Sequence, residues 1–204
     1  TSQSRRTFPT LALNNLDLIV KSLKDDGINY SINEYDKSII IQEPGLNFIE
    51  LINLETSKKI SNKEENNKWN FHHINLECYD VRSSVNFVSQ YLKMKEGAWK
   101  APFELGKVNI KPNQLAIFNL DDNHSGIHIN KADFTFSSRN NFMHNPTIGG
   151  HPAFNVKDIK LFIKKLKSSD IAVTDAKIYA MPNIHQIYFF DPSANIIEVN
   201  QNIN

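Results

Sequence analysis

Two stretches of the chain, residues 73–80 and 151–158, follow one pattern. Each begins with a histidine, alternates through a strand-like run and reaches an aspartate seven residues later. Each is followed by a run with helical spacing and then by strand-like runs. The last of these carries another possible metal ligand, His128 in the first copy and Glu198 in the second. Such a repeat indicates a fold assembled from copies of one supersecondary unit.

The elements of each copy are expected in the order β-α-β-β-β. The first copy is predicted to have a helix after Asp80 and strands at residues 73–78, 97–100, 114–119 and 126–130. The second copy is predicted to have a helix after Asp158 and strands at residues 151–156, 171–173, 186–190 and 196–200. The two aspartates are expected to cap their helices. The sequence therefore predicts an α+β fold of repeated βαβββ modules.

Strand parity places the possible ligands on one side of these strands. Side chains two residues apart share a face, so His73 and Glu77 lie on the same face of the first strand, opposite an apolar face. By the same parity His151, His128 and Glu198 are on the more polar faces of their strands. Helices packed on the apolar faces would leave a polar, concave sheet face. Four ligands pointing into it predict a metal site.

A single histidine near a strand start is more often a core or surface residue than a ligand. The repeat changes that balance, because ligand-type residues fall at equivalent places in both copies. His72 is an alternative to His73 in the strand register, but parity and the repeat both favour His73. Of the remaining histidines, His124 is expected in a turn and His144 in the connection between the copies. His185 is expected either at the mouth of the concave face or, equally well, at a solvated strand end.

A third, degenerate copy occupies the N-terminal part of the chain. Residues 8–15 resemble residues 151–158, with Phe8 in place of the histidine, and Glu50 stands where Glu198 stands. We expect this unit to be structural. The predicted organisation is a degenerate module at residues 1–56, a polar linker at 57–70, and two paired modules, 71–131 and 150–204, that together make up residues 71–204.

Composition excludes several classes of partner. The net charge of +1 implies neither nucleic acid nor an anionic membrane surface. No apolar run has the length of a membrane span, and no secretory signal is recognisable. The single cysteine, Cys78, excludes an intrachain disulfide and suits a reducing compartment, so a cytoplasmic location is expected. Its parity indicates a packing residue rather than a nucleophile.

Two motifs resemble the vicinal oxygen chelate superfamily, which includes glyoxalase I, methylmalonyl-CoA epimerase, fosfomycin resistance proteins and extradiol dioxygenases. They are His73-x-Asn-Leu-x-x-x-Asp80 and the ending Gln186-Ile-Tyr-Phe-Phe-Asp-Pro-Ser-Ala-Asn-Ile-Ile-Glu198, in which Ala194 replaces the usual glycine. The resemblance implies that two modules form a cup around one divalent metal ion. Carried over by position, the metal ligands are His73, His128, His151 and Glu198.

Three imidazoles and one carboxylate suit Zn²⁺, Fe²⁺, Mn²⁺, Ni²⁺ or Co²⁺. By resemblance, the first hypothesis is a glyoxalase-like lyase or isomerase. In it, the metal would chelate two neighbouring oxygens of a small substrate and stabilise an enolate. Glu198 is the candidate base. Glu77 is a second catalytic candidate because it shares the His73 face, although an exposed carboxylate at a strand end fits its position equally well.

Two alternatives stay open. His73, His151 and Glu198 alone form the two-histidine, one-carboxylate set of Fe²⁺ dioxygenases, in which case His128 would support the site or act as an acid or base. A non-catalytic protein that sequesters a small molecule is the third hypothesis. The unpaired N-terminal module predicts either a homodimer or a partner module that precedes Thr1 in a longer protein.

Overall fold

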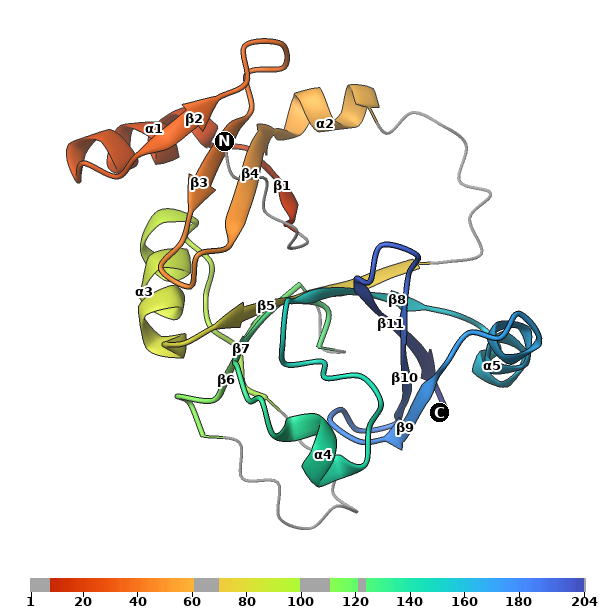
Figure 1. The fold of residues 1–204 in the computed structure, drawn as a ribbon. Coiled ribbons are helices and arrows are strands. Elements are labelled where there is room, and N and C mark those ends of the chain that lie inside the picture. The colour runs from red at the N-terminus through yellow and green to blue at the C-terminus, as the bar shows by residue number, and fades with distance from the viewer. Residues whose placement is uncertain (1–7, 61–69, 100–110, 121–123, 204) are drawn as a thin grey trace.

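The computed structural model describes residues 8–60, 70–99, 111–120 and 124–203, which form two sheets (Figure 1). The N-terminal sheet has the strand order β1-β4-β3-β2. Its elements are β1 (Thr10–Leu13), α1 (Leu16–Asp25), β2 (Tyr30–Ile32), β3 (Ile39–Gln42) and β4 (Phe48–Asn53), followed by α2 (Leu54–Ile60). No helix among the described residues has the length and apolar character needed to cross a membrane.

The second sheet has seven strands in the order β6-β7-β5-β8-β11-β10-β9. Its first half contains β5 (Asn70–Cys78), α3 (Val81–Tyr91), β6 (Leu115–Asn119) and β7 (Gly126–Lys131). After α4 (Phe136–Asn140), its second half contains β8 (His151–Asn155), α5 (Ile159–Ser168), β9 (Thr174–Ile178), β10 (Ile184–Phe190) and β11 (Ile196–Asn202). The halves join where β5 pairs with β8 in antiparallel fashion.

All three modules share one strand register, which confirms the repeated α+β architecture. In each module, the first strand pairs in parallel with the last. The opening residue (His73, His151 or Phe8) lies in the first strand or just before it, and the last strand carries the closing residue (His128, Glu198 or Glu50). The residue two places after the opening residue is paired with the closing residue. The pairs are Asn75 with His128, Ala153 with Glu198 and Thr10 with Glu50. Because paired residues on neighbouring strands point to the same face, the opening and closing residues of each module project to one side of the sheet.

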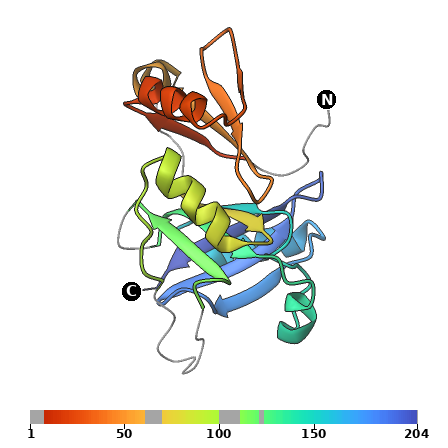
Figure 2. The same cartoon turned by 90° about the vertical axis from the view of Figure 1, so that its left-hand side faces the viewer.

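The apolar faces pack on the helices. Asp80 caps α3 by accepting hydrogen bonds from the backbone N–H groups of Arg82 and Ser83, and Asp158 caps α5 by accepting one from Leu161. Both caps are as predicted. α3 packs on the outer side of the first half of the seven-stranded sheet (Figures 1 and 2), and α5 packs on the outer side of the second half (Figure 1). The inner face is therefore left for the site.

The N-terminal module packs against α3 and shares its core. Leu23 of α1 and Ile49 of β4 belong to the same buried cluster as Val88 of α3. The hydroxyl of Tyr91 donates a hydrogen bond to Asp26 at the end of α1, at 3.0 Å. In both views the N-terminal sheet therefore sits on α3, away from the polar face of the larger sheet (Figures 1 and 2).

Three sequence expectations differ from the structure. α2 occupies the beginning of the predicted linker, because the Asn53 side chain accepts a hydrogen bond from the Glu55 N–H and Glu55 pairs with Lys58 one turn later. No strand forms at residues 97–99, where Gly97 only donates one hydrogen bond to the Ile117 carbonyl. The strand expected at 171–173 begins instead at Thr174. Residues 61–69 and 100–110 lie outside the described residues.

Candidate metal centre

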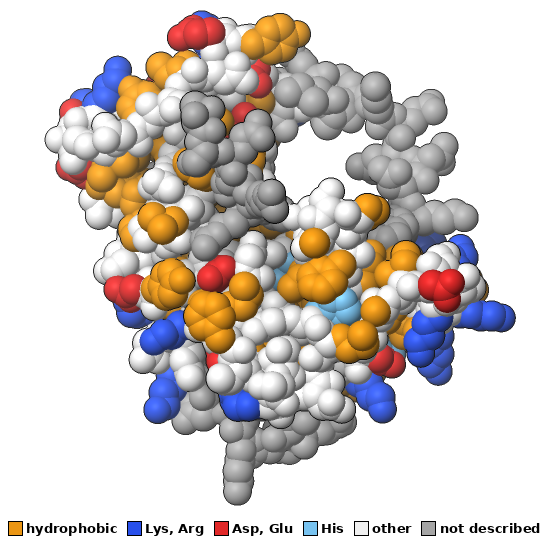
Figure 3. Space-filling view, in the orientation of Figure 1, with side chains coloured by type: hydrophobic (Ala, Val, Ile, Leu, Met, Phe, Trp, Pro, Cys, Tyr) orange, Lys and Arg blue, Asp and Glu red, His pale blue; other side chains and the backbone are white. Residues whose placement is uncertain are grey.

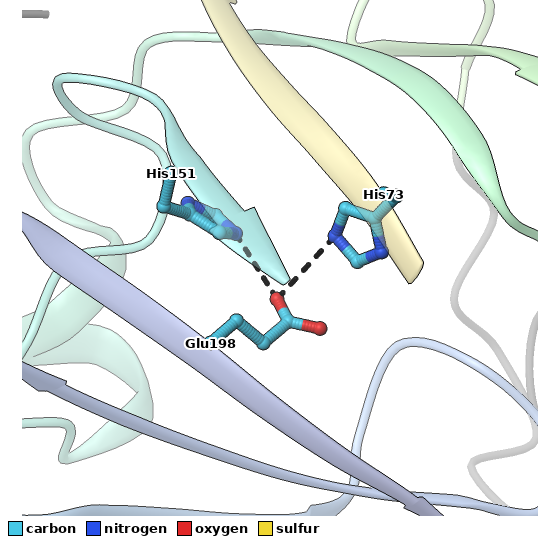
Figure 4. A group of neighbouring side chains, drawn as sticks. All are labelled: His73, His151 and Glu198. Carbon is cyan, nitrogen blue, oxygen red and sulfur yellow. Dashed lines mark hydrogen bonds and ion pairs between the residues drawn. The ribbon is translucent and has the colours of Figure 1, made fainter. Parts of the chain in front are cut away.

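Three of the four predicted ligands meet on the polar face of the seven-stranded sheet. His73 from β5, His151 from β8 and Glu198 from β11 point toward one another (Figure 4). Their ligand atoms all lie within 4.8 Å of each other, and all three residues are buried. The Glu198 Oε2 atom is 3.0 Å from His151 Nε2 and 3.6 Å from His73 Nε2. This is the only such group found among the described histidine, cysteine, aspartate and glutamate side chains.

The three residues fit a divalent metal ion. His73 Nε2 is buried without a hydrogen-bond partner, since its 3.6 Å separation from the carboxylate is too long for a hydrogen bond. A buried ring nitrogen left in this state is costly unless something else binds it. Two imidazole nitrogens and one carboxylate oxygen converging on a point form the donor set preferred by iron, manganese and zinc.

Two amide side chains hold the carboxylate in place. Glu198 Oε1 accepts hydrogen bonds from Gln186 Nε2 at 3.0 Å and from Asn200 Nδ2 at 2.8 Å, which leaves Oε2 facing the histidines. Burial alone would raise the pKa of Glu198, but His73 and His151 outweigh burial and hold that pKa well below its ordinary value. The carboxylate is therefore ionised. The sequence signal for Gln186 was a polar residue inside an otherwise strand-like apolar run.

His128, the fourth predicted ligand, lies beside this group and is not part of it. Its ring stacks on that of His73 with a centroid distance of 3.8 Å. Its Nε2 is 2.7 Å from the backbone oxygen of His124 and must donate to it, because a carbonyl can only accept. Burial, aided by the neighbouring His73, lowers the pKa of His128 well below its ordinary value, so the ring is neutral.

Glu77, the second catalytic candidate, is buried, but it does not line the cavity at the metal centre. Its carboxylate accepts a hydrogen bond from the backbone N–H of Gly149, in the connection that leads into β8. Parity assigned Glu77 to the correct face. The connection, however, crosses that face here, so closely that a side chain on Gly150 would meet the Asn75 carbonyl at 2.7 Å. We therefore interpret Glu77 as an anchor for this connection.

A cavity of about 720 Å³ opens at the metal centre. Its apolar wall includes Trp99, whose ring lies edge-on against His128 at 5.1 Å, and Phe136 of α4. Tyr188 also lines it, and burial raises the pKa of Tyr188 well above its ordinary value, so its hydroxyl remains protonated. Polar side chains complete the lining, among them Asn75, Gln114, Asn130, Lys131 and Arg139. In the space-filling view, a small area of histidine surface lies among hydrophobic side chains below the N-terminal sheet (Figure 3).

The remaining histidines and Cys78 have structural roles outside the ligand group. His124 is buried and provides the carbonyl that binds His128. His144, expected in an ordinary loop, is also buried, with its Nδ1 2.8 Å from the Thr174 hydroxyl. The Nε2 atom of His185 is 2.6 Å from the Oδ1 atom of Asp175. Cys78 is buried in the core, and burial raises the pKa of its thiol to about 12, so it is a packing residue as predicted.

The buried imidazoles make the metal-free protein sensitive to acid. Burial lowers the pKa of His73 from 6.5 to about 4, although Glu198 offsets part of the effect. Between these two values the unfolded chain binds a proton on this residue that the folded chain does not, so the free energy of unfolding falls as pH falls. His128 acts in the same direction, and Glu198 does so at lower pH, because its folded pKa is also lowered.

We therefore expect metal-free protein to lose about 3 kcal/mol of stability through His73 alone between pH 7.5 and 4. Urea unfolding in the presence of a chelator, repeated at several pH values, measures this loss. An unfolding free energy that stayed constant over the range would contradict the burial of neutral imidazoles.

Comparison with known proteins gives matches of fold. No protein family model matches the sequence, and no curated protein matches it. Among solved structures, a catechol 2,3-dioxygenase matches 97% of this chain with 72% of its own, at a TM-score of 0.61 and 14% identity. The 2,3-dioxygenase LapB from Pseudomonas sp. KL28 matches 95% of this chain with 69% of its own, at a TM-score of 0.62 and 12% identity.

A Mn(II)-bound glyoxalase from Novosphingobium aromaticivorans has the same fold over 96% of this chain and 62% of its own. Its TM-score is 0.57 and its identity 12%. At these identities the likeness concerns the fold, and the chemistry has to be argued from the side chains of this chain.

Proposed function

We propose that this chain, which has the fold of the vicinal oxygen chelate superfamily as its motifs predicted, is a metal-dependent enzyme. His73, His151 and Glu198 would hold one divalent metal ion, and a small substrate would bind it through two neighbouring oxygen atoms. The cavity of about 720 Å³ is large enough for a substrate of one ring and its substituents. The reaction favoured by the site is O₂-dependent cleavage of a catechol-like ring by Fe²⁺.

The observation that carries this proposal is the position of His128. With its Nε2 donating to the His124 carbonyl, the converging ligands are two histidines and one carboxylate. This set leaves enough open coordination positions for a bidentate substrate and O₂ together, and it is typical of non-haem Fe²⁺ oxygenases. When bound, the metal would supply Lewis-acid and redox chemistry. Two of the structures with this fold are dioxygenases, which agrees with the proposal.

The protein's own residues would bind the substrate and move its protons. Trp99 and Phe136 offer apolar surface for a flat ring. Tyr188, whose hydroxyl accepts a hydrogen bond from Gln186 at 3.3 Å, stays protonated and can donate to a substrate oxygen. With Nε2 donating to the His124 carbonyl, the neutral His128 ring has its lone pair on Nδ1, which could accept a proton from the substrate. Because burial disfavours the charged ring, His128 would hold that proton only transiently.

A glyoxalase-like lyase or isomerase is the second candidate, and the fold match to a Mn(II)-bound glyoxalase favours it. In that reaction the ionised Glu198 would take a proton from carbon next to a substrate carbonyl. This candidate requires no O₂. If it used the four ligands predicted from the sequence, His128 would have to leave the His124 carbonyl and turn toward the metal. The two candidates therefore differ in their dependence on O₂ and in the role of His128.

Metal content and O₂ uptake test the proposal. Protein purified without a histidine tag is reconstituted anaerobically with Fe²⁺, Mn²⁺ or Zn²⁺ and supplied with catechol in an oxygen electrode. We expect about one metal per chain, with O₂ consumed by the Fe²⁺ form and not by the Zn²⁺ form. Turnover of an α-keto hemithioacetal without O₂ would favour the second candidate. Folded protein that binds none of these metals would contradict both.

A further inference from the structure

His72, immediately before a candidate ligand, contacts that ligand through a local irregularity of β5. The register between β5 and β8 shifts between Phe71 and His73, so that His72 is the extra residue of a β-bulge. In a regular strand, neighbouring side chains point to opposite faces, but bulges often redirect a side chain beside a functional site. Here the Nδ1 atoms of His72 and His73 are 2.7 Å apart, and both rings are buried.

This contact fixes how one proton is shared. At 2.7 Å one Nδ1 must carry a hydrogen and the other must offer its lone pair. If His72 donates, neutral His73 carries its own proton on Nε2, the atom that faces Glu198, and cannot bind a metal there. If His72 accepts, His73 is protonated on Nδ1, and its Nε2 lone pair is available. The arrangement of His72 thus decides whether His73 is competent as a ligand.

We propose that His72 is the positioning residue of the metal centre: by accepting a hydrogen bond from Nδ1 of His73 it selects the tautomer whose Nε2 binds the metal. This inference rests on the proposed metal site of His73, His151 and Glu198. Metal-bound histidines usually donate their second N–H to a carboxylate or carbonyl, which can only accept. A histidine in that position differs, because it can also donate.

The ability of His72 to donate as well as accept matters in the metal-free protein. With His72 donating, the His73 Nε2–H faces the buried Glu198 carboxylate, to which it is 3.6 Å distant. With His72 accepting, the same nitrogen faces the metal as a lone pair. Exchange between the two arrangements leaves the number of protons on the pair unchanged: the shared hydrogen passes from His72 Nδ1 to His73 Nδ1, the His73 Nε2 proton is released to water, and His72 Nε2 takes up a proton from water. His72 also lines a second cavity of about 190 Å³ with Ser125 and Asn155, so polar groups lie near the ring that then carries its proton on Nε2.

Three variants separate hydrogen bonding from packing. His72→Phe keeps a buried ring but removes the acceptor, and we expect it to weaken Zn²⁺ binding about 10- to 100-fold. His72→Asn places an amide oxygen where Nδ1 stood, and we expect its affinity to stay close to that of the wild type. His144→Phe is the matched control, since it removes an equally buried imidazole whose Nδ1 contacts Thr174, away from the cavity of the metal centre. Competition with a chromophoric chelator gives the affinities.

A spectroscopic readout does not depend on any variant folding. In wild-type protein with ¹⁵N-labelled histidine and bound Zn²⁺, long-range ¹H–¹⁵N spectra should show His73 protonated on Nδ1 and His72 protonated on Nε2. The opposite tautomer of His72 would overturn the inference, as would full Zn²⁺ affinity in His72→Phe or an equal loss in His72→Asn. Folded wild-type protein that binds no Zn²⁺ would instead overturn the proposed metal site itself, and the role of His72 with it.

Discussion

His151→Ala is expected to abolish metal binding and turnover together. The variant removes one of three ligands and leaves His73 and Glu198 as the only members of the group. Loss of a direct ligand should exceed the roughly 10- to 100-fold cost of losing an outer hydrogen-bond partner of a metal site. It also removes the 3.0 Å contact that helps to keep the buried Glu198 ionised. Elemental analysis and a chelator competition measure the loss, and circular dichroism confirms that the variant folds.

His144→Ala is the control for this experiment. His144 is as buried as His151, but its ring contacts Thr174 and Phe190 instead of the cavity, so its removal should leave one metal per chain. Stoichiometric metal in His151→Ala would contradict the proposed centre. Full binding of a substrate analogue by metal-free His151→Ala would favour the third hypothesis, a protein that only sequesters its ligand.

The repeat and strand parity could predict the part of the site that depends on regular strands. His73 and His151 stand at equivalent places in equivalent strands. Glu198 of the closing strand is paired with Ala153, which lies two residues after His151 and therefore on the same face. Where pairing is regular, alternation fixes the face of each side chain, so convergence of these three residues follows from the sequence. The same reasoning also predicted that Glu50 of the degenerate module occupies the place of Glu198. The Glu50 carboxylate accepts a hydrogen bond from the Ser38 hydroxyl at 2.8 Å.

Parity could not predict features that depend on loops and irregularities. The face of Glu77 was assigned correctly, but the backbone of Gly149 covers it, and no alternation pattern gives the path of that connection. His72 was set aside because regular alternation points it away from His73, and the bulge that reverses this leaves no mark in the sequence. Pairing of the N-terminal module with another chain and a cytoplasmic location both stay predictions.

His128→Phe is expected to separate chemistry from metal binding. The phenyl ring can keep the stacking contact with His73, which has a centroid distance of 3.8 Å, while both ring nitrogens are lost. Because His128 Nε2 is engaged by the His124 carbonyl, we expect the variant to retain about one metal per chain. A proton-transfer residue typically contributes about 10²- to 10⁴-fold to the rate, so kcat should fall by that factor while KM changes little.

The outcome distinguishes a three-ligand site from a four-ligand site, and the two candidate reactions differ in this respect. If His128 is a fourth ligand, as the four-ligand glyoxalase-like hypothesis requires, His128→Phe should lose metal affinity as His151→Ala does. If three ligands suffice, the two variants should diverge, with metal retained in one and lost in the other. Metal content, Zn²⁺ affinity and kcat measured side by side on both variants decide between these results. Loss of metal from His128→Phe in a folded protein would contradict the three-ligand site and, with it, the argument for O₂ chemistry.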